Sequence, residues 1–317
     1  MAEVIKKATR EGYGEGLVEL GAEYPQLVVM DADLAAATKT GAFKKAYPDR
    51  FIDTGIAEGN MMSIAAGLAT TGKIVFASSF AMFAAGRAFE QVRNMIGYPH
   101  LNVKLGATHG GITVGEDGAT HQALEDFGTM RTIPGMTVIC PADATAARAA
   151  VEAAIEYVGP VYLRFGRYAT PVLYDSSYRF EIGKGRVLGD GEDCTVIANG
   201  VMVEQALLAK ELLAKDGISA RIIDMPTIKP LDKALVLESA AKTGALVTAE
   251  EHNIIGGLGS AVAEVLCENL PCPMQRVGVE DSFGRSGTVP ALMELYGLTS
   301  AHIAAKAKVA VAQKKNG

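Results

Sequence analysis

Cysteine is scarce in this sequence, and its spacing argues against the usual thiol sites. The 317 residues contain four cysteines, at positions 140, 194, 267 and 272, with no C-x-x-C pair. The gap between Cys267 and Cys272 is one that zinc sites use, but no second close pair of Cys or His completes such a site. Scattered thiols in a chain of this length predict a reducing, cytoplasmic location.

Long hydrophobic runs and an excess of positive charge are also missing. No apolar run approaches the ~20 residues of a membrane-spanning helix, and the segment Met1–Lys7 lacks the apolar core of a signal peptide. The formal net charge of −6 gives no sign of binding to nucleic acid or to an anionic membrane. We therefore expect neither partner, although a local cluster of cations could still serve an anionic substrate.

The chain does have a regular alternation of strand-length apolar runs and helix-length amphipathic segments. Its length is enough for two domains of roughly 150 residues each, and 49% of its residues are hydrophobic. In the first half we predict strands at Leu27–Met30, Lys73–Ser78, Asn102–Gly106, Met136–Ile139 and Val161–Phe165, and helices at Thr9–Glu23, Glu58–Thr71, Ala85–Ile96 and Asp143–Val158, with Asp143 as an N-cap. This alternation predicts a parallel sheet covered by helices on both faces.

The stretch from 166 to 192 interrupts the alternation and marks the domain boundary. Its Gly-, Tyr- and Ser-rich sequence is typical of a linker and a hairpin. Beyond it we predict strands at Thr195–Ala198, Ala220–Ile223, Leu246–Ala249 and Gln275–Val279, and helices at Val203–Lys215, Asp232–Thr243, Ser260–Asn269 and Ala301–Gln313. The prediction is an α/β chain of two consecutive parallel-sheet domains, 1–168 and 193–317, joined by a linker and hairpin over 169–192.

The loops that follow the strands of the first domain are the candidate site, because ligands of open parallel sheets bind beyond the carboxyl ends of the strands. One of these loops holds Glu58, at the point where the chain turns from strand to helix. A carboxyl beside Ala57, Ile56 and Met61 could be desolvated and kept protonated near pH 7. The simpler interpretation is a helix-start acid that favours the N-terminal dipole.

Two further loops carry residues suited to chemistry. Ala107–Gln122 holds two of the five histidines, His109 and His121, together with Asp117 and four glycines. Histidines place protons at neutral pH; the alternatives are a surface loop, or a metal site made by these two histidines and Asp117. In the other loop, Phe80 and Phe83 start a helix, where they could stack on a flat heterocycle or simply belong to the core.

Two glycine motifs look functional but fit poorly. Gly189-Asp-Gly191 followed by Asn199 resembles a Gly-Asp-Gly…Asn motif that binds magnesium and diphosphate, but the gap is too short, and a turn is the better interpretation. Gly257-Leu-Gly259 partly matches a dinucleotide fingerprint. Its third position is Val262, and too many residues separate it from the preceding strand.

Taken together, the loops resemble the C-terminal half of transketolase, in order and over nearly the whole chain. The matching segments are Ile52-Asp-Thr-Gly-Ile-Ala-Glu-Gly-Asn-Met, Ser79-Phe-Ala-Met-Phe, His109 through His121-Gln, Asp31-Ala-Asp-Leu and Phe283-Gly-Arg-Ser-Gly. The resemblance implies a thiamine-diphosphate enzyme with a pyrimidine-binding domain followed by a transketolase C-terminal domain. The family's diphosphate-binding domain, which also holds Mg²⁺ or Ca²⁺, has no counterpart here, so no metal site is expected in this chain.

The resemblance therefore implies a split transketolase that is active with a separate N-terminal subunit, as a heterotetramer. The implied reaction moves a two-carbon ketol unit from a ketose phosphate to an aldose phosphate, in pentose phosphate metabolism. Glu58 would promote the imino form of the cofactor through ring nitrogen N1′. The other implied roles are pyrimidine stacking for Phe80 and Phe83, cofactor contact for Asp33, substrate contact or proton transfer for His109, Asp117 and His121, and phosphate binding for Arg164 and Thr38.

Three positions depart from the family pattern. Gly59 stands where a larger residue usually follows the glutamate, Ala37 where many relatives have a phosphate-binding Ser, and Gly86 where a third aromatic is expected. These departures leave the donor and acceptor sugars open. Rival hypotheses are a subunit related to 1-deoxyxylulose-5-phosphate synthase or to the β subunit of 2-oxo acid dehydrogenases, a non-catalytic scaffold subunit, and a dinucleotide-binding protein.

Overall fold

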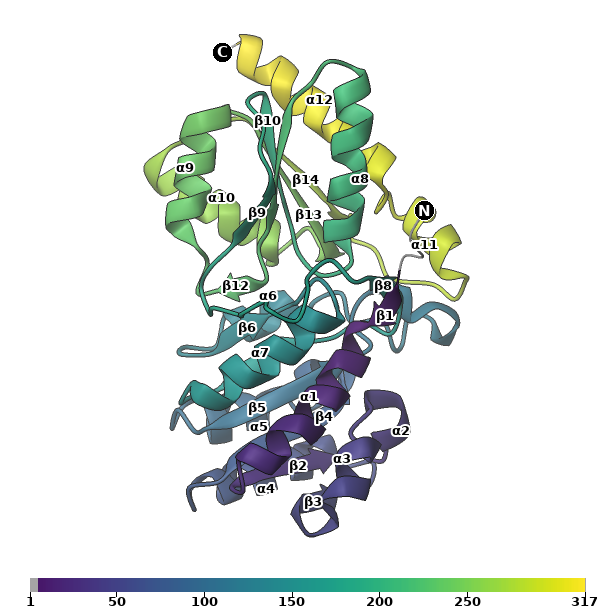
Figure 1. The fold of residues 1–317 in the computed structure, drawn as a ribbon, viewed down its shortest axis with the longest axis vertical. Coiled ribbons are helices and arrows are strands. Elements are labelled where there is room, and N and C mark those ends of the chain that lie inside the picture. Colours follow the sequence, from purple (N-terminus) through teal and green to yellow (C-terminus); the bar gives the residue numbers. More distant parts are fainter. Residues whose placement is uncertain (1–4, 317) are drawn as a thin grey trace.

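The computed structural model describes residues 5–316, which form two α/β units stacked end to end (Figure 1). The first unit lies in the lower part of the view and the second in the upper part. Each is built on a mostly parallel sheet with helices on both faces. The predicted fold class is therefore confirmed.

The sheet of the first unit has seven strands in the order β12-β6-β7-β5-β4-β2-β3. Their bounds are β2 Leu27–Asp31, β3 Phe51–Asp53, β4 Ile74–Phe80, β5 Val103–Thr108, β6 Thr137–Ile139, β7 Val161–Arg164 and β12 Thr227–Lys229. The chain runs from β2 to β3 on one side and then returns to β4 on the other side of β2. The carboxyl ends of β2 and β4 therefore border the crevice where open sheets of this kind bind ligands.

Helices cover this sheet in two layers. On one face lie α1 (Thr9–Glu23), α3 (Gly41–Ala46) and α7 (Ala144–Glu156); on the other lie α4 (Glu58–Ala69), η2 (Phe83–Arg87), α5 (Phe89–Gln91), η3 (Val92–Gly97) and α6 (Asp126–Arg131). Asp143 caps α7 as predicted, because its Oδ1 accepts the N–H of Ala146 at 2.7 Å.

The predicted helix over Ala85–Ile96 is not a regular α-helix. The chain there forms two π-helical segments, η2 and η3, on either side of the short α5. Wide π turns let side chains leave the helix at directions that the α-helical period does not give, and such turns are frequent at functional sites. η2 starts at Phe83, directly beside the crevice.

The second unit has a five-stranded sheet in the order β14-β13-β10-β11-β9. Its strands are β9 Arg186–Gly189, β10 Cys194–Ala198, β11 Ala220–Asp224, β13 Leu246–Asn253 and β14 Met274–Val279. One face is covered by α8 (Met202–Lys215), α11 (Val289–Leu295) and α12 (Ser300–Asn316). The other face is covered by α9 (Lys233–Thr243) and α10 (Leu258–Asn269). The helices and central strands lie close to their predicted positions.

The hairpin expected over 169–192 is absent. Its two strands pair elsewhere: β8 (Ala169–Pro171) with β1 (Lys6–Ala8), and β9 with β11. Both pairings are antiparallel. The segment instead connects the two units. Its two strands do not pair with each other, and each one pairs with a strand from another part of the chain.

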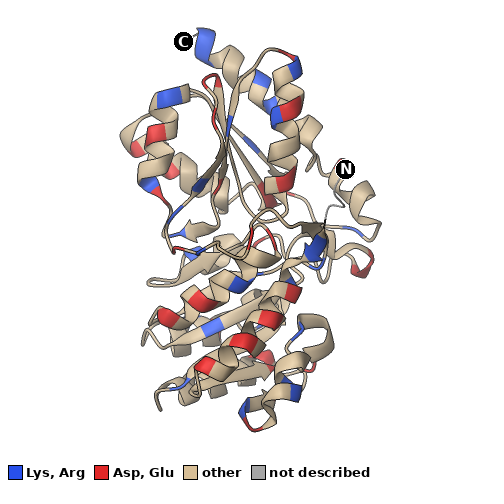
Figure 2. Cartoon of the chain, in the orientation of Figure 1, with Lys and Arg blue, Asp and Glu red and all other residues tan. Residues whose placement is uncertain are grey.

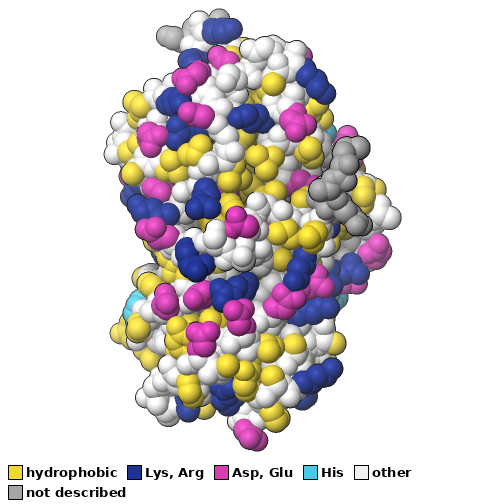
Figure 3. All heavy atoms as spheres, in the orientation of Figure 1, with side chains coloured by type: hydrophobic (Ala, Val, Ile, Leu, Met, Phe, Trp, Pro, Cys, Tyr) yellow, Lys and Arg dark blue, Asp and Glu magenta, His cyan; other side chains and the backbone are white. Residues whose placement is uncertain are grey.

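Charged side chains of both signs are mixed over the surface. Acids recur on successive turns of α1, at Glu11, Glu15, Glu19 and Glu23, and Figure 2 shows red segments along this helix. Glu15 and Glu19 pair with Lys7 and Arg148. On the face drawn in Figure 3, both charge signs are interspersed with hydrophobic side chains. Within residues 5–316, no helix combines the length and apolar character needed to cross a bilayer.

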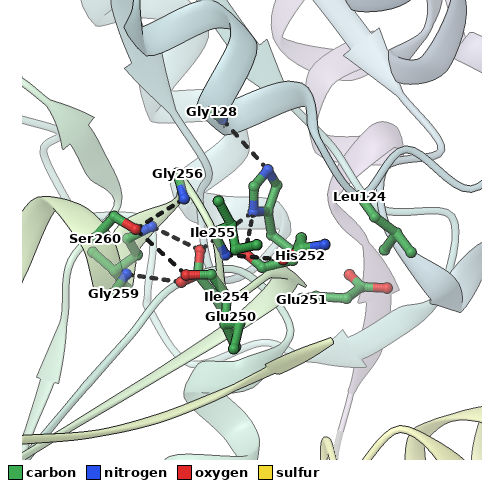
Figure 4. A network of polar contacts seen from close by, with 12 residues as sticks. Leu124, Gly128, Glu250, Glu251, His252, Ile254, Ile255, Gly256, Gly259 and Ser260 are labelled. Atoms are coloured by element: carbon green, nitrogen blue, oxygen red, sulfur yellow. Dashed lines mark hydrogen bonds and ion pairs between the residues drawn. The ribbon is translucent and has the colours of Figure 1, made fainter. Parts of the chain in front are cut away.

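Three consecutive buried polar residues of β13 connect the two units. Glu251 accepts the N–H of Thr113 at 2.6 Å. His252 stacks on Phe127 with ring centroids 5.0 Å apart, and its Nε2 accepts the N–H of Gly128. Figure 4 shows His252 pointing towards Gly128 of the first unit and Glu250 pointing the other way, towards Gly259. Glu251 and His252 thus make contacts across the two units, whereas Glu250 is paired within the second unit.

Glu250 fills the position that the dinucleotide hypothesis would give to a phosphate. Its two carboxyl oxygens accept the N–H groups of Leu258 and Gly259, both at 2.7 Å, at the start of α10. An anion bound by the chain itself already uses these donors. Burial nevertheless raises the pKa of Glu250 to about 7, against the opposing effect of the two backbone hydrogen bonds.

The raised pKa of Glu250 predicts how stability depends on pH. The folded chain holds this proton more tightly than the unfolded chain, so the contribution is complete below about pH 4.5 and is lost as the pH rises through about 7. We expect urea denaturation to show an unfolding free energy that falls by about 3 kcal/mol over this range from this group. Asp224, whose pKa burial also raises to about 7, adds a fall of the same sign.

Glu250→Gln should reduce the pH slope, and Asp224→Asn is the matched control that leaves the Glu250 part in place. An unchanged slope in Glu250→Gln would contradict the assignment.

Candidate functional site

Glu58 is the first residue of α4 and lies beneath the crevice. The side chain is 1% exposed, so the burial expected from its apolar neighbours in sequence is present. Its Oε2 accepts a hydrogen bond from Nη1 of Arg87 at 2.8 Å, and its Oε1 accepts one from Ser79 Oγ at 3.3 Å. No sequence pattern indicated the Arg87 partner, which η2 brings back across the crevice.

Four rings gather above the end of β4. Phe80 and Phe83 stack with centroids 5.9 Å apart, and His109 stacks on Phe80 at 3.8 Å. His121 meets the edge of Phe83 at 5.4 Å. Phe80 is buried under His109, whereas Phe83 is half-buried and keeps part of its ring open. Phe80 therefore belongs to the core, and Phe83 is the partly exposed ring of the pair.

His109 is held as a neutral ring of defined tautomer. Nε2 lies 3.1 Å from Arg10 Nη1, which can only donate, so Nε2 accepts. Nδ1 is then the protonated nitrogen and donates to Thr108 Oγ1 at 2.9 Å. Burial, and then the nearby cations, lower the pKa of His109 to about 3. Its backbone φ of 58° places it in the left-handed region, a strained conformation that is common at functional sites.

Three cations act on His109 through their charge, and only Arg10 among them contacts the ring. Arg10, Arg167 and Lys39 each lower the pKa of this ring through their charge. Arg10 comes from α1, Lys39 follows the short α2 (Ala35–Thr38), and Arg167 follows β7. Arg10 Nε is buried without a protein partner. Their positions in sequence share no motif, and only the common edge of the sheet brings them together.

The other residues predicted to contact a ligand in the crevice differ in how exposed their side chains are. Thr38 is fully buried and its hydroxyl donates to Asp31 Oδ2 at 2.7 Å, so it is not free to hold a phosphate. Asp33 is exposed at the rim, where its N–H donates to Asp53 Oδ1 at 3.1 Å. Asp117 is exposed at the end of η4 (Ile112–Asp117) and does not join the ring cluster.

Arg164 lies between the two units, and its phosphate-binding role stays a prediction. It is 3% exposed and donates to the carbonyls of Glu251 and Ala123 at 2.8 and 3.0 Å. Its Nε lies 3.3 Å from Asp126 Oδ2. The donors of Arg164 are thus paired inside the protein. Arg167, three residues later, is half-buried and donates to the carbonyl of Val114 and to Glu116.

The proposed metal site is not formed, and the Gly-Asp-Gly triplet forms a turn. Within residues 5–316, no group of three or more His, Cys, Asp or Glu side chains is arranged to hold a metal ion. Asp190 of the triplet is exposed between β9 and β10 and pairs with Lys242 at 2.7 Å. The structure therefore favours the turn interpretation of that triplet.

Models of two known protein domains match the two units of this chain. A model of the transketolase pyrimidine binding domain matches residues 5–172, and a model of the transketolase C-terminal domain matches residues 183–303. The chain belongs to the transketolase family.

Individual relatives give a finer picture. A putative transketolase C-terminal section from Methanocaldococcus jannaschii is 53% identical, with 95% of each chain covered. A 6-deoxy-6-sulfo-D-fructose transketolase subunit from a Clostridium species is 45% identical over 97% of this chain and 95% of its own length. Among solved structures, a split gene transketolase described as an inactive beta4 tetramer aligns with TM-score 0.91 and 54% identity, covering 97% of this chain and 99% of its own.

The hydrogen bonds of Arg164 predict a structural role that can be measured. Arg164→Ala leaves Asp126 buried without its cation, so the unfolding free energy should fall by about 3 kcal/mol in chemical denaturation. Arg167→Ala is the matched control and should change stability by less than about 1 kcal/mol, because Arg167 is partly exposed. Equal stabilities of the two variants would show that Arg164 is not a structural residue.

The environment of His109 predicts a ring that does not titrate at physiological pH. In ¹⁵N NMR of the histidines, His109 should keep a protonated Nδ1 and an unprotonated Nε2 from about pH 5 to 9. Arg10→Ala should raise its pKa, because a nearby cation and a hydrogen-bond donor are removed together. A doubly protonated His109 at about pH 6 would refute this assignment.

Proposed function

We propose that this chain is the catalytic C-terminal-type subunit of a two-chain transketolase. It would transfer a two-carbon ketol unit from a ketose phosphate to an aldose phosphate with thiamine diphosphate as cofactor. The observation that carries this proposal is the buried carboxyl of Glu58 at the start of α4, which Arg87 links to the partly exposed ring of Phe83. His109 and His121 complete the cluster around these rings.

The crevice fits the pyrimidine end of the cofactor. Glu58 supplies a buried hydrogen-bonding carboxyl, and Phe83 supplies a face on which a flat heterocycle can stack. When bound, the cofactor supplies the electron sink for breaking a carbon–carbon bond next to a carbonyl. The acids near the crevice are not grouped to hold a metal within the described residues. We therefore assign the diphosphate end, with Mg²⁺ or Ca²⁺, to an N-terminal subunit.

The remaining residues of the crevice suit a polyhydroxylated, anionic substrate. The one acceptor nitrogen of His109, Nε2, already accepts a hydrogen bond from Arg10, so accepting one from a substrate hydroxyl would require Arg10 to turn away. His121 and the exposed Asp117 belong to the same loop and are proposed as further substrate contacts, and the exposed Asp33 after β2 is proposed as a cofactor contact. In this proposal Glu58, His109 and His121 are the catalytic groups.

The sequence assigned phosphate binding to Thr38 and Arg164. We propose instead that Arg10, Lys39 and Arg167, whose charges all act on His109, bind the phosphate. Two of the three are arginines, whose planar guanidinium groups match the geometry of phosphate oxygens. The same three cations would also suit a sulfonate, which agrees with the sulfosugar in the name of the Clostridium relative.

We therefore propose a class of substrates, sugars that carry an anionic group, and no single sugar. One of the subunits of an apulose-4-phosphate transketolase from Phocaeicola vulgatus is 39% identical over 92% of this chain and 93% of its own length. The names of these two relatives thus contain different sugars, and each of these sugars carries an anionic group. Pentose phosphates are the first substrates to test.

The assembly is the second part of the proposal. A relative named as a C-terminal section, and another described as a split-gene enzyme that is an inactive tetramer of one subunit, support a requirement for an N-terminal partner. We propose a heterotetramer of the two kinds of subunit, located in the cytoplasm. A related subunit acting on pyruvate or another 2-oxo acid is the second candidate, because it would share this architecture.

Glu58→Ala provides the test. The chain is mixed with an N-terminal-type transketolase subunit, Mg²⁺ and thiamine diphosphate, and ketol transfer between pentose phosphates is assayed. We expect activity to fall at least about 100-fold in Glu58→Ala, since the carboxyl acts directly on the cofactor, while assembly measured by light scattering is unchanged. Glu90→Ala, an exposed acid of α5, is the control and should keep full activity.

Three outcomes would contradict the proposal. Full activity of Glu58→Ala would remove Glu58 from catalysis. Turnover of pyruvate without ketol transfer would favour the 2-oxo acid candidate, and assembly without any turnover would favour a scaffold subunit.

A further inference from the structure

Arg87 joins the two groups that the proposed function assigns to the pyrimidine ring. Its Nη1 donates to Glu58 Oε2 at 2.8 Å. The same guanidinium lies over the ring of Phe83, with its central carbon 4.7 Å from the ring centroid. The Arg87 side chain is 53% exposed, whereas Glu58 is 1% exposed. A half-exposed surface side chain therefore reaches inward to a buried carboxyl and covers the open aromatic face.

A guanidinium and an aminopyrimidine make the same kinds of contact. Both are flat, both present N–H donors in their plane, and both stack on aromatic rings. The proposed function asks the pyrimidine to hydrogen-bond with Glu58 and to stack on Phe83. Arg87 already makes both contacts. A pyrimidine placed over the same ring face and against the same oxygen would overlap the guanidinium of Arg87.

We propose that Arg87 occupies the pyrimidine subsite in the unassembled chain and competes with the cofactor for Glu58. This inference rests on the proposed function. The exchange replaces one stacked, hydrogen-bonded group with another of the same kind. Arg87 is already half in water, so it can be released to solvent with little loss of packing. Until then it keeps a buried carboxylate paired, which would otherwise be costly.

The departures from the family pattern make room for this arrangement. Gly86 stands where a third aromatic is expected, and a Cβ at this position would approach only Met82 Cε, at 2.8 Å. At Gly59, a Cβ would lie 3.2 Å from Gln91 Oε1. Met82 therefore lies in the space beside Gly86, and Gln91 of α5 lies in the space beside Gly59. Gly86 directly precedes Arg87 and adds no side chain of its own next to the guanidinium.

The test uses the full chain without a partner and the free pyrimidine half of the cofactor, 4-amino-5-hydroxymethyl-2-methylpyrimidine. Its dissociation constant is measured by NMR titration. Arg87→Ala should bind it about tenfold more tightly than the natural chain, because the competing ion pair is gone. Arg87→Gln, which keeps a donor but loses the charge, should also bind more tightly. Arg93→Ala removes one exposed cation from the next segment and should bind as the natural chain does.

The readouts separate competition from a purely structural role. Loss of the ion pair should lower the thermal midpoint of Arg87→Ala, and the pyrimidine should restore it. A lowered midpoint without tighter binding, weaker binding, or no binding to any variant would overturn the inference.

Glu58→Ala separates this inference from the proposed function. If it binds the pyrimidine as well as the natural chain does, the subsite is not at Glu58 and the proposed function fails. If binding depends on Glu58 but Arg87→Ala gains nothing, only the competition fails.

Discussion

The pairing of buried carboxyl groups determines how this molecule is assembled. A carboxylate removed from water is stable only with a cation or a set of N–H and O–H donors. Asp31 receives the hydroxyls of Thr38 and Thr40, and Glu250 receives two N–H groups of α10. Asp126 receives Tyr162 and Arg164. Each of these pairings fixes one loop or one domain contact, and the crevice is built on the frame they make.

Glu58 differs from the other buried acids in the nature of its partner. Asp31, Asp126 and Glu250 are held by groups that are themselves buried or part of a helix backbone, so their contacts are permanent parts of the fold. The main partner of Glu58 is a half-exposed side chain. A contact of this kind is weaker and can be exchanged. The buried acid to which the proposed function gives the cofactor contact is thus the one whose partner can leave.

Sequence periodicity was sufficient for the regular elements and for the loops that carry the site. α1 begins and ends where predicted, and Glu58, Phe80, Phe83, His109 and His121 do converge on one edge of the sheet. These successes share a cause, since helices with apolar faces and parallel strands direct their following loops to the same edge. Short segments were missed: β12 has three residues, and its partner strand lies about ninety residues earlier.

Side-chain partners could not be read from the sequence. Arg164 and Arg167 are only three residues apart, yet one is buried against Asp126 and the other acts on His109 through its charge. The resemblance favoured the strand residue, but the turn after β7 decides which side chain reaches the crevice. Arg10, Lys39 and Arg87 were missed for the same reason. Each is an ordinary surface cation in sequence, and its role exists only through contacts made across the fold.

The strand β12 has a consequence for the independence of the two units. It belongs in sequence to the second unit but completes the sheet of the first, antiparallel to β6. A protein ending at the linker would therefore leave the edge of β6 unpaired, with free N–H and C=O groups ready to accept a foreign strand. The two units are separate in the family models but share one sheet edge. Recombination that exchanged one unit for that of a distant relative would have to preserve the fit of this borrowed strand.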